Sequence, residues 1–169
     1  MIQGDGLFPH MNVEDNVMLP FASSKDVPVE IISRLQYLTR LLGLTPYMNR
    51  YPYELSGGTK ARVSLARCFI TMPALLLLDE AFGSLDVAWK AAIYAELDNL
   101  SRDAGSTIIM VTHDLIEAQK IADVLLVLNQ SGRKAALMPI EKRVSPAELE
   151  RQIVQWIRPG HPAYVTLEP

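Results

Sequence analysis

"LLLLDEAFGSLD", residues 75–86, carries the strongest indication of a buried strand in this sequence. Four leucines run straight into two adjacent carboxylates, Asp79 and Glu80, and a turn then leads to a further aspartate, Asp86. A short, continuous apolar run of this kind is typical of a strand that is buried on both faces of a parallel sheet. Because ligands of open α/β sheets bind at the carboxyl ends of the strands, the pattern predicts a ligand that faces these acids.

Helices and strands alternate on both sides of this stretch. Continuous apolar runs predict two more buried strands, at 106–112 and 123–129, and "NQSGR" at 129–133 indicates a hairpin turn after them. Apolar residues at helical spacing and capping signals predict helices at 29–42, 56–72, 87–103, from 114 onward and from 145 onward. The alternation predicts an α/β fold, in which a parallel sheet has helices on both faces.

Composition and charge narrow the functional classes. A length of 169 residues fits one domain, and the net charge of −3, the pI near 5.6 and the scattered basic residues argue against nucleic acid as a partner. The single cysteine, Cys68, argues against a disulfide scaffold and favours a reducing compartment. The apolar runs fall short of the ~18 residues that span a bilayer. The mean hydropathy of +0.12 is high, so we expect either a rich core or an apolar surface that contacts a partner.

Polar residues suited to phosphoryl transfer gather at the predicted strand ends. Asp79 can hold Mg²⁺, and Glu80 beside it suits a general base for a water molecule. His113 follows the strand at 106–112 and so is expected at the same edge. Ser-Gly-Gly at 56–58 opens a helix whose N–H groups and dipole favour an anion. Each feature alone is commonly just a strand end, a surface histidine or a helix cap, but their joint order indicates a Mg-nucleotide.

Three segments together resemble the ATPases of ATP-binding cassette (ABC) transporters: "LSGGTKARVSLARCF", "LLLLDEAFGSLD" and "TIIMVTHDLIEAQKIAD". Gln3, with "LFPHMNVEDNV" after it, resembles the family's Q-loop and the segment that contacts membrane subunits. "YPYELSGG" is similar to the lead into the signature motif of importers. The resemblance covers roughly residues 1–130 and implies a P-loop NTPase-like fold.

The resemblance implies a hydrolytic set of residues around one nucleotide. Gln3 and Asp79 would approach Mg²⁺, with Asp79 at the end of the Walker B strand. Glu80 matches the catalytic glutamate, which polarises the attacking water, and His113 matches the switch histidine, which holds the γ-phosphate. ATP and Mg²⁺ are the implied cofactors, and ATP hydrolysis that drives transmembrane transport is the implied activity.

A second set of residues is implied to serve the ATP of an opposite subunit. Ser56, Gly57 and Gly58 match the signature motif, which grips the γ-phosphate of that ATP, and "SLD" matches the D-loop, which puts Asp86 on the dimer seam. The implied partners are a second ABC ATPase subunit and the transmembrane permease subunits of an importer. The implied location is cytoplasmic, peripheral on the inner face of the cell membrane.

The sequence departs from the family most strongly in the phosphate-binding loop. No Gly-x-x-x-x-Gly-Lys-[Ser/Thr] motif occurs, so the phosphate cradle, its lysine and its Mg-binding hydroxyl are missing, and we predict that the isolated chain is inactive. Thr59 stands where glutamine is commonest, and Gly4 stands where a polar residue is more usual. We interpret Met1 as an internal methionine and the chain as a C-terminal portion of a cassette. A truncated gene, a partial gene model and a split subunit would each give this sequence.

We therefore expect a single partial domain with four segments. They are a Q-loop region at 1–19, a helical and signature subdomain at 20–72, a Walker B to switch-histidine core at 73–130, and a C-terminal hairpin and helix at 131–169. In this fold the strand that leads to the P-loop lies between the strands at 106–112 and 123–129. Without it, we predict either a gap with unpaired strand edges or direct pairing of those two strands.

Two other functional classes stay open. The first is a DNA-organising ATPase of the chromosome-maintenance type, which has one lobe with a signature and a Walker B strand but without a P-loop. In that class a long heptad-patterned arm precedes the signature. Residues 1–54 show neither such an arm nor basic enrichment. A non-enzymatic module, a cassette remnant that only docks on a partner, is favoured by the missing P-loop and weakly disfavoured by Glu80 and His113. Nucleotide binding by the isolated chain separates these interpretations.

Overall fold

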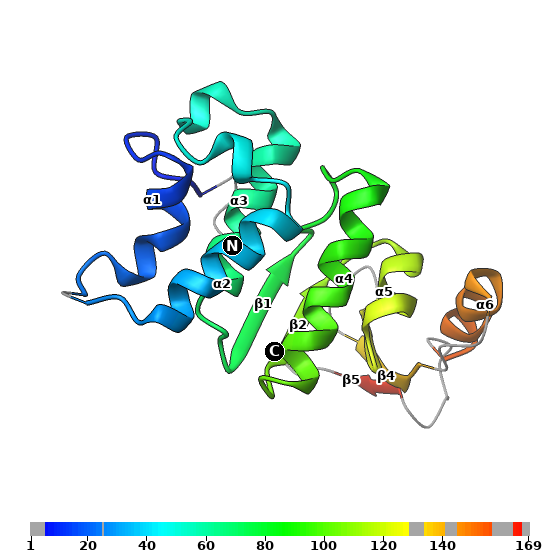
Figure 1. The fold of residues 1–169 in the computed structure, drawn as a ribbon. Coiled ribbons are helices and arrows are strands. Elements are labelled where there is room, and N and C mark those ends of the chain that lie inside the picture. Colours follow the sequence, from blue (N-terminus) through cyan, green and yellow to red (C-terminus); the bar gives the residue numbers. More distant parts are fainter. Residues whose placement is uncertain (1–5, 25, 129–133, 141–144, 157–163, 167–169) are drawn as a thin grey trace. The chain divides into compact units, whose positions relative to one another are not determined.

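The structure is a computed structural model that describes residues 6–24, 26–128, 134–140, 145–156 and 164–166. The chain forms two compact units, residues 1–111 and 112–169. Each unit combines helices with a small sheet (Figure 1), so the predicted α/β fold class is confirmed, with an incomplete sheet.

The first unit begins with helices. These are α1 (Val13–Met18), α2 (Val29–Leu41) and α3 (Gly57–Phe69), with 3₁₀ turns at Leu19–Phe21, Thr45–Tyr47 and Pro52–Glu54. Helix α2 ends as predicted just before Gly43, whose φ of +60° is accessible to glycine at little cost. Ser56 caps α3 as predicted, since its hydroxyl accepts a hydrogen bond from the N–H of Thr59 at 3.2 Å.

Strands β1 (Leu75–Asp79) and β2 (Thr107–Val111) follow and pair in parallel. Leu75 lies opposite Thr107 and Asp79 opposite Val111, so the predicted acidic strand end is at the edge of a parallel pair. Helix α4 (Val87–Arg102) connects the two strands (Figure 1). It buries three apolar residues at helical spacing: Ile93, Leu97 and Leu100.

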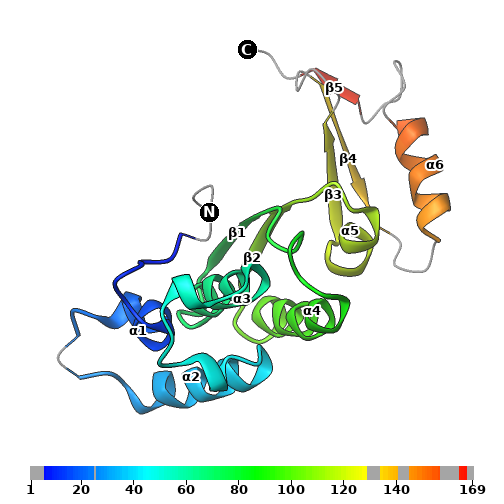
Figure 2. The ribbon, with the colours of Figure 1, turned by 90° about the horizontal axis from the view of Figure 1, so that it is seen from above.

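The parallel pair is buried on one face only. Leu76 and Leu78 of β1 are 4% and 2% exposed, and Figure 2 shows α3 and α4 along one side of the β1–β2 pair. The opposite face carries an open apolar row of four side chains that are each more than half exposed: Leu75, Leu77, Ile109 and Val111. The prediction that these strands are buried on both faces is therefore wrong. A continuous apolar run makes both faces of a strand apolar, but it does not supply the element that covers the second face.

A buried ion pair joins α2 to α4. Glu96 of α4 is fully buried, and its carboxylate accepts hydrogen bonds from the guanidinium of Arg34 and, at 2.8 Å, from the hydroxyl of Tyr37. Burial and the bond to Glu96 raise the pKa of Tyr37. The pair fixes the helical part of this unit to the helix that follows the acidic turn.

The second unit contains an antiparallel sheet. Its elements are α5 (Leu115–Ile121), β3 (Val124–Leu128), β4 (Lys134–Pro139), α6 (Pro146–Trp156) and β5 (Tyr164–Thr166), with strand order β3-β4-β5. Leu128 lies opposite Ala135, as in the predicted hairpin, whose turn at 129–133 lies outside the described residues. Ser145 caps α6 as predicted, because its hydroxyl accepts from the N–H of Glu148 at 3.2 Å.

Strands β2 and β3 belong to separate sheets in the described part of the chain. Each sheet is described within its own unit, so direct pairing of the two strands stays a prediction. Strand β3 is half exposed like β1, with one row of side chains in solvent: Val124, Leu126 and Leu128.

Candidate functional site

Asp79 and Glu80 lie where β1 ends, and both are exposed. The backbone N–H of Glu80 donates to the carbonyl oxygen of Val111 at 2.9 Å, so pairing with β2 holds the residue after the strand. Glu80 has a φ of +43°, in the left-handed region where a side chain is strained. Strain of this kind persists only where the surroundings enforce it, and it concentrates at functional sites.

Buried side chains hold the turn after Glu80 in place. Three of its side chains are buried: Ala81, Phe82 and Leu85. Phe82 packs edge-on against Tyr94 of α4, with 5.7 Å between the ring centroids. Asp86 is exposed at the start of α4, and its carboxylate makes no capping hydrogen bond to that helix. The anchored turn thus holds Glu80 and Asp86 at its two ends.

The first turn of α3 lies against this acidic turn. A Cβ on Gly58 would be 3.1 Å from the carbonyl oxygen of Ser84, so glycine permits the close approach of the two backbones. A Cβ on Gly57 would meet no atom within 4 Å, and Ser56 beside it is exposed. The N–H groups and positive end of this 13-residue helix can bind an anion. The structure therefore brings the predicted signature and D-loop residues together within one unit.

His113 belongs to the second unit and lies, exposed, just before α5. Hydrogen bonds fix the residues on both sides of it. The hydroxyl of Thr112 accepts from the N–H of Asp114 at 3.0 Å and donates to the carboxylate of Glu117 at 2.8 Å. Asp114 in turn caps α5 by accepting from the N–H of Ile116 at 2.8 Å. The acids and the histidine that the sequence predicts thus lie in different units, each on a fixed backbone.

The predicted Mg²⁺ ligands are Gln3 and Asp79, and Gln3 lies outside the described residues. Among the residues that are described, no group of three or more His, Cys, Asp or Glu could hold a metal ion. Asp79 offers an exposed carboxylate. Mg²⁺ in proteins is usually bound by one or two carboxylates, and water and phosphate oxygens complete its coordination shell. The residue present therefore fits Mg²⁺ bound together with a nucleotide.

Sequence reasoning missed two buried residues around these turns. Arg62 of α3 is 8% exposed, and burial lowers the pKa of its guanidinium. Arg62 lies three residues before Leu65 and seven before Phe69, and both of these residues are buried. This helical spacing puts Arg62 on the same buried face and could have predicted its burial. Glu117 is 5% exposed, and its spacing from Asp114 is that of a capping box.

Asn16 is a further residue that the sequence did not reveal. It is fully buried in α1; its amide oxygen accepts from the N–H of Phe8 at 2.8 Å, and its amide nitrogen donates to the carbonyl oxygens of Phe8 and Met11 at 3.1 and 3.0 Å. Arg67 of α3 donates to the carbonyl oxygen of Gly6 at 2.9 Å. The loop after the predicted Q-loop glutamine is thus fixed to two helices, while Phe8 stays 41% exposed.

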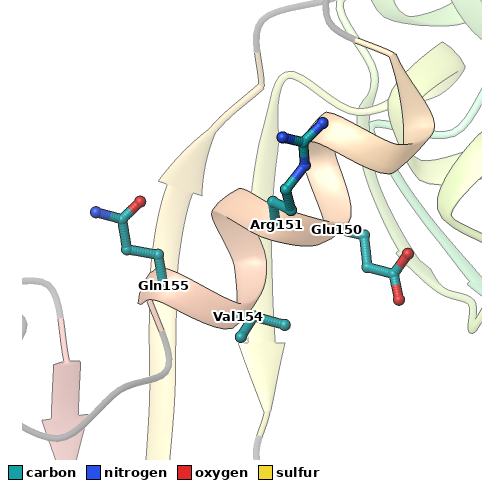
Figure 3. Close-up of a pocket in the computed structure, with 4 residues that line it drawn as sticks. All are labelled: Glu150, Arg151, Val154 and Gln155. Carbon is teal, nitrogen blue, oxygen red and sulfur yellow. The ribbon is translucent and has the colours of Figure 1, made fainter.

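Neither of two surface hollows is lined by a predicted site residue. One, of about 550 Å³, lies between α2 and α4 and includes Arg34, Tyr37 and Glu96. The other, of about 390 Å³, is formed by side chains that project from α6 alone (Figure 3): Glu150, Arg151, Val154 and Gln155. In the described parts of the chain, no helix has the length and apolar character needed to cross a membrane.

Residues 1–83 match the protein family described as "ABC transporter". The trehalose/maltose import ATP-binding protein MalK of Thermococcus litoralis is 39% identical over 147 residues, which cover 87% of this chain and 40% of the relative. The spermidine/putrescine import ATP-binding protein PotA of Nitrosomonas eutropha is 42% identical over 129 residues, which cover 76% of this chain and 36% of the relative. The chain thus spans 40% or less of the length of these two curated relatives.

Solved structures show the same fold. A structure of the ATP-binding subunit of an ABC transporter superposes with a TM-score of 0.76 at 22% identity, over 90% of this chain and 66% of that one. The dimeric structure of the ATP-binding cassette MJ0796, in a post-hydrolysis state bound to ADP and Pi, gives a TM-score of 0.65 at 27% identity, over 74% of this chain and 55% of that one. The predicted α/β fold is therefore that of ATP-binding cassettes.

Proposed function

Because the chain belongs to the family of ABC transporter ATPases, we propose that it supplies residues for Mg-ATP hydrolysis to the ATP-binding cassette of an importer. One observation carries the proposal: the strained Glu80, next to Asp79 at the carboxyl end of β1, is held by β2 beside a turn that contacts the first turn of α3. The importer type is suggested by the printed names of the two curated relatives, which are import ATP-binding proteins.

In the proposed site, each of the chain's own residues has a separate role. ATP with Mg²⁺ supplies the phosphoryl group and the charge that stabilises it. Asp79 would hold Mg²⁺ through its carboxylate, and Gln3 is the second proposed ligand. Glu80 accepts the proton of the attacking water as a general base, a role for which an exposed carboxylate on a fixed backbone is suited. His113 donates a hydrogen bond to the γ-phosphate, and the caps around it fix its backbone.

A second ABC ATPase subunit is the proposed partner across the nucleotide. Ser56, Gly57 and Gly58 would bind the γ-phosphate of ATP held by that subunit, because their turn presents N–H groups and open space beside Gly57. Asp86 would lie on the seam between the two subunits. The dimeric state of a similar solved cassette supports this arrangement.

Permease subunits are the proposed second partner, at the loop around Phe8. Leu7, Phe8 and Pro9, with α2, would contact a helix of a transmembrane subunit and keep the chain peripheral on the inner face of the membrane. A backbone fixed by Asn16 with an exposed aromatic side chain suits such a contact. Cysteine at Phe8 should crosslink to a permease subunit in the assembled transporter. Crosslinks that form only within this chain would contradict the contact.

The isolated chain is proposed to be inactive. Its sequence has signature, Walker B and switch residues, but no Gly-x-x-x-x-Gly-Lys-[Ser/Thr] loop to cradle the phosphates. Titration of the purified chain with labelled ATP and Mg²⁺ should therefore give weak binding or none. Micromolar affinity would contradict the proposal that these residues form only part of the nucleotide site.

A non-enzymatic docking module remains the second candidate, and the open apolar row on β1 and β2 favours it, since such a surface fits a partner. Supplying a P-loop separates the two candidates. An enzyme component would gain ATP hydrolysis that depends on Glu80, whereas a docking module would gain none.

A further inference from the structure

His113 is the middle residue of a turn that the side chain of Thr112 closes. The backbone N–H of Asp114 donates to the hydroxyl oxygen of Thr112 at 3.0 Å, so this hydrogen bond spans His113. In a turn of this kind the threonine oxygen takes the place of a backbone carbonyl oxygen as the acceptor. The bond therefore restricts the backbone conformation of His113 itself.

The hydroxyl of Thr112 is held in turn by a buried carboxylate. It donates to Oε2 of Glu117 at 2.8 Å, and Glu117 is only 5% exposed. The groups involved decide the direction of both bonds, because a backbone N–H only donates and an ionised carboxylate only accepts. Thr112 thus uses its oxygen toward Asp114 and its hydroxyl hydrogen toward Glu117.

Capping of α5 does not require the side chain of Glu117. The carboxylate of Asp114 caps this helix, since it accepts from the N–H groups of Ile116 and Glu117 at 2.8 and 3.3 Å. A buried carboxylate is costly and is tolerated where hydrogen bonds compensate it. The side chain of Glu117 makes such a bond with the residue directly before His113. All of these contacts lie within the second unit.

We propose that Thr112 and Glu117 are positioning residues for His113, which hold its backbone in the conformation that brings the imidazole to the γ-phosphate. The inference rests on the proposed function of His113. Glu117 acts through the hydroxyl of Thr112, and Thr112 acts through the backbone of His113. Loss of the hydroxyl should therefore reproduce, more weakly, the effect of losing the imidazole.

The first measurement uses the full chain without nucleotide and follows hydrogen exchange at single amides. Thr112→Val replaces the hydroxyl by a methyl group of the same shape and should speed the exchange of the Asp114 N–H about tenfold, the scale of one lost hydrogen bond. Thr112→Ser retains the hydroxyl and should keep this exchange slow. The N–H of Ala118, which bonds the carbonyl oxygen of Asp114 at 3.0 Å, is the reference inside α5 and should exchange at its original rate. Unchanged exchange at Asp114 in Thr112→Val would contradict the proposal.

The second measurement is ATP hydrolysis by the chain joined to the P-loop segment of the PotA relative. Thr112→Val should lower kcat about tenfold and shift KM in the same direction as His113→Ala does. Thr112→Ser should restore kcat. Glu117→Met removes the acceptor of the Thr112 hydroxyl and should also lower kcat, whereas Glu117→Gln keeps an acceptor oxygen and should retain turnover.

A double variant separates positioning from a loss of stability. Thr112→Val added to His113→Ala should lower kcat no further, because the imidazole that Thr112 positions is already absent. Additive losses would argue against positioning. Thr39→Val is the matched control, because it removes a buried hydroxyl that bonds the carbonyl oxygen of Gln36 at 3.2 Å in the first unit, and it should leave kcat unaltered.

Failure of the positioning role and failure of the proposed function can be told apart. If His113→Ala lowers kcat and Thr112→Val does not, the positioning role is wrong and the proposed role of His113 stands. If His113→Ala hydrolyses ATP like the unmodified joined chain, the proposed role of His113 is wrong, and the positioning role with it.

Discussion

Glu80 is the residue at which the proposed function and the stability of the fold oppose each other. Its φ of +43° is enforced by the strand pairing of its N–H with Val111 and by the buried side chains of the turn that follows. A glutamate in this conformation costs about 1–3 kcal/mol, which a glycine would not incur. The sequence retains the carboxylate despite this cost, which supports a role for the group itself.

Glu80→Gly should therefore stabilise the chain, by about 1 kcal/mol after allowing for the greater freedom of glycine in the unfolded state. Urea denaturation measures the change. Glu80→Ala is the control, since it removes the same carboxylate but keeps a Cβ at the strained position, and it should give no such gain. Equal stability of the two variants would show that backbone strain is not the cause.

At the scale of elements, the contact between α2 and α4 depends on one buried ion pair. Glu96 is fully buried, and the side chain of Arg34 is 17% exposed. Removing one partner of such a pair leaves an uncompensated charge, which costs more than the pair itself contributes.

Arg34→Met should lower the free energy of unfolding by about 3–5 kcal/mol, because Glu96 would stay buried without its cation. The double variant Arg34→Met/Glu96→Leu should recover much of that loss. Arg102→Met is the matched control, because Arg102 pairs with Asp98 in solvent and should change stability by about 1 kcal/mol or less. A double variant as unstable as Arg34→Met would argue against the ion pair as the source.

The positions of the elements could largely be predicted from the sequence. The strand predicted from the leucine run is β1, which ends at Asp79, and α3 begins directly after Ser56, its capping residue. These features depend on local signals, namely apolar runs, glycine stops and capping side chains. What covers each strand depends on other elements, so the sequence could not show that Leu75 and Leu77 are exposed.

The acidic and glycine residues of the candidate site could also be predicted, but the residues that hold them could not. Asp79, Glu80 and 56–58 are conspicuous because their types and order are unusual. Arg62 and Asn16 act through bonds to backbone atoms of distant residues, Leu42 and Phe8, which no local pattern specifies. Their roles become visible only when the segments are folded together.

At the scale of the whole molecule, both units expose apolar sheet faces. The open apolar row of the first unit and the exposed residues of β3 in the second are aliphatic side chains in strands. Surfaces and strand edges of this kind recruit other chains. This agrees with the high mean hydropathy of +0.12.

We predict that the purified chain self-associates or is poorly soluble on its own. Replacing Leu77 and Ile109 of the open apolar row by lysine should shift it toward a monomer in size-exclusion chromatography. Val87→Lys is the control, because Val87 is 84% exposed at the start of α4, outside the row, and should have no such effect. A monodisperse monomer with a sharp thermal transition in the unmodified chain would contradict this prediction.

The proposed role of Glu80 is to activate water for hydrolysis of a nucleotide whose phosphate cradle this sequence lacks. It is tested most directly by joining the chain to the P-loop segment of the PotA relative that is 42% identical to it, and measuring ATP binding and hydrolysis. Glu80→Gln should bind ATP with unchanged affinity and hydrolyse it about 10²–10⁴-fold more slowly, because the amide keeps the shape of the side chain and loses the base. Glu14→Gln, a change at an exposed position of α1, should leave hydrolysis unaltered. Near-normal turnover by Glu80→Gln would contradict the role of Glu80 as the general base.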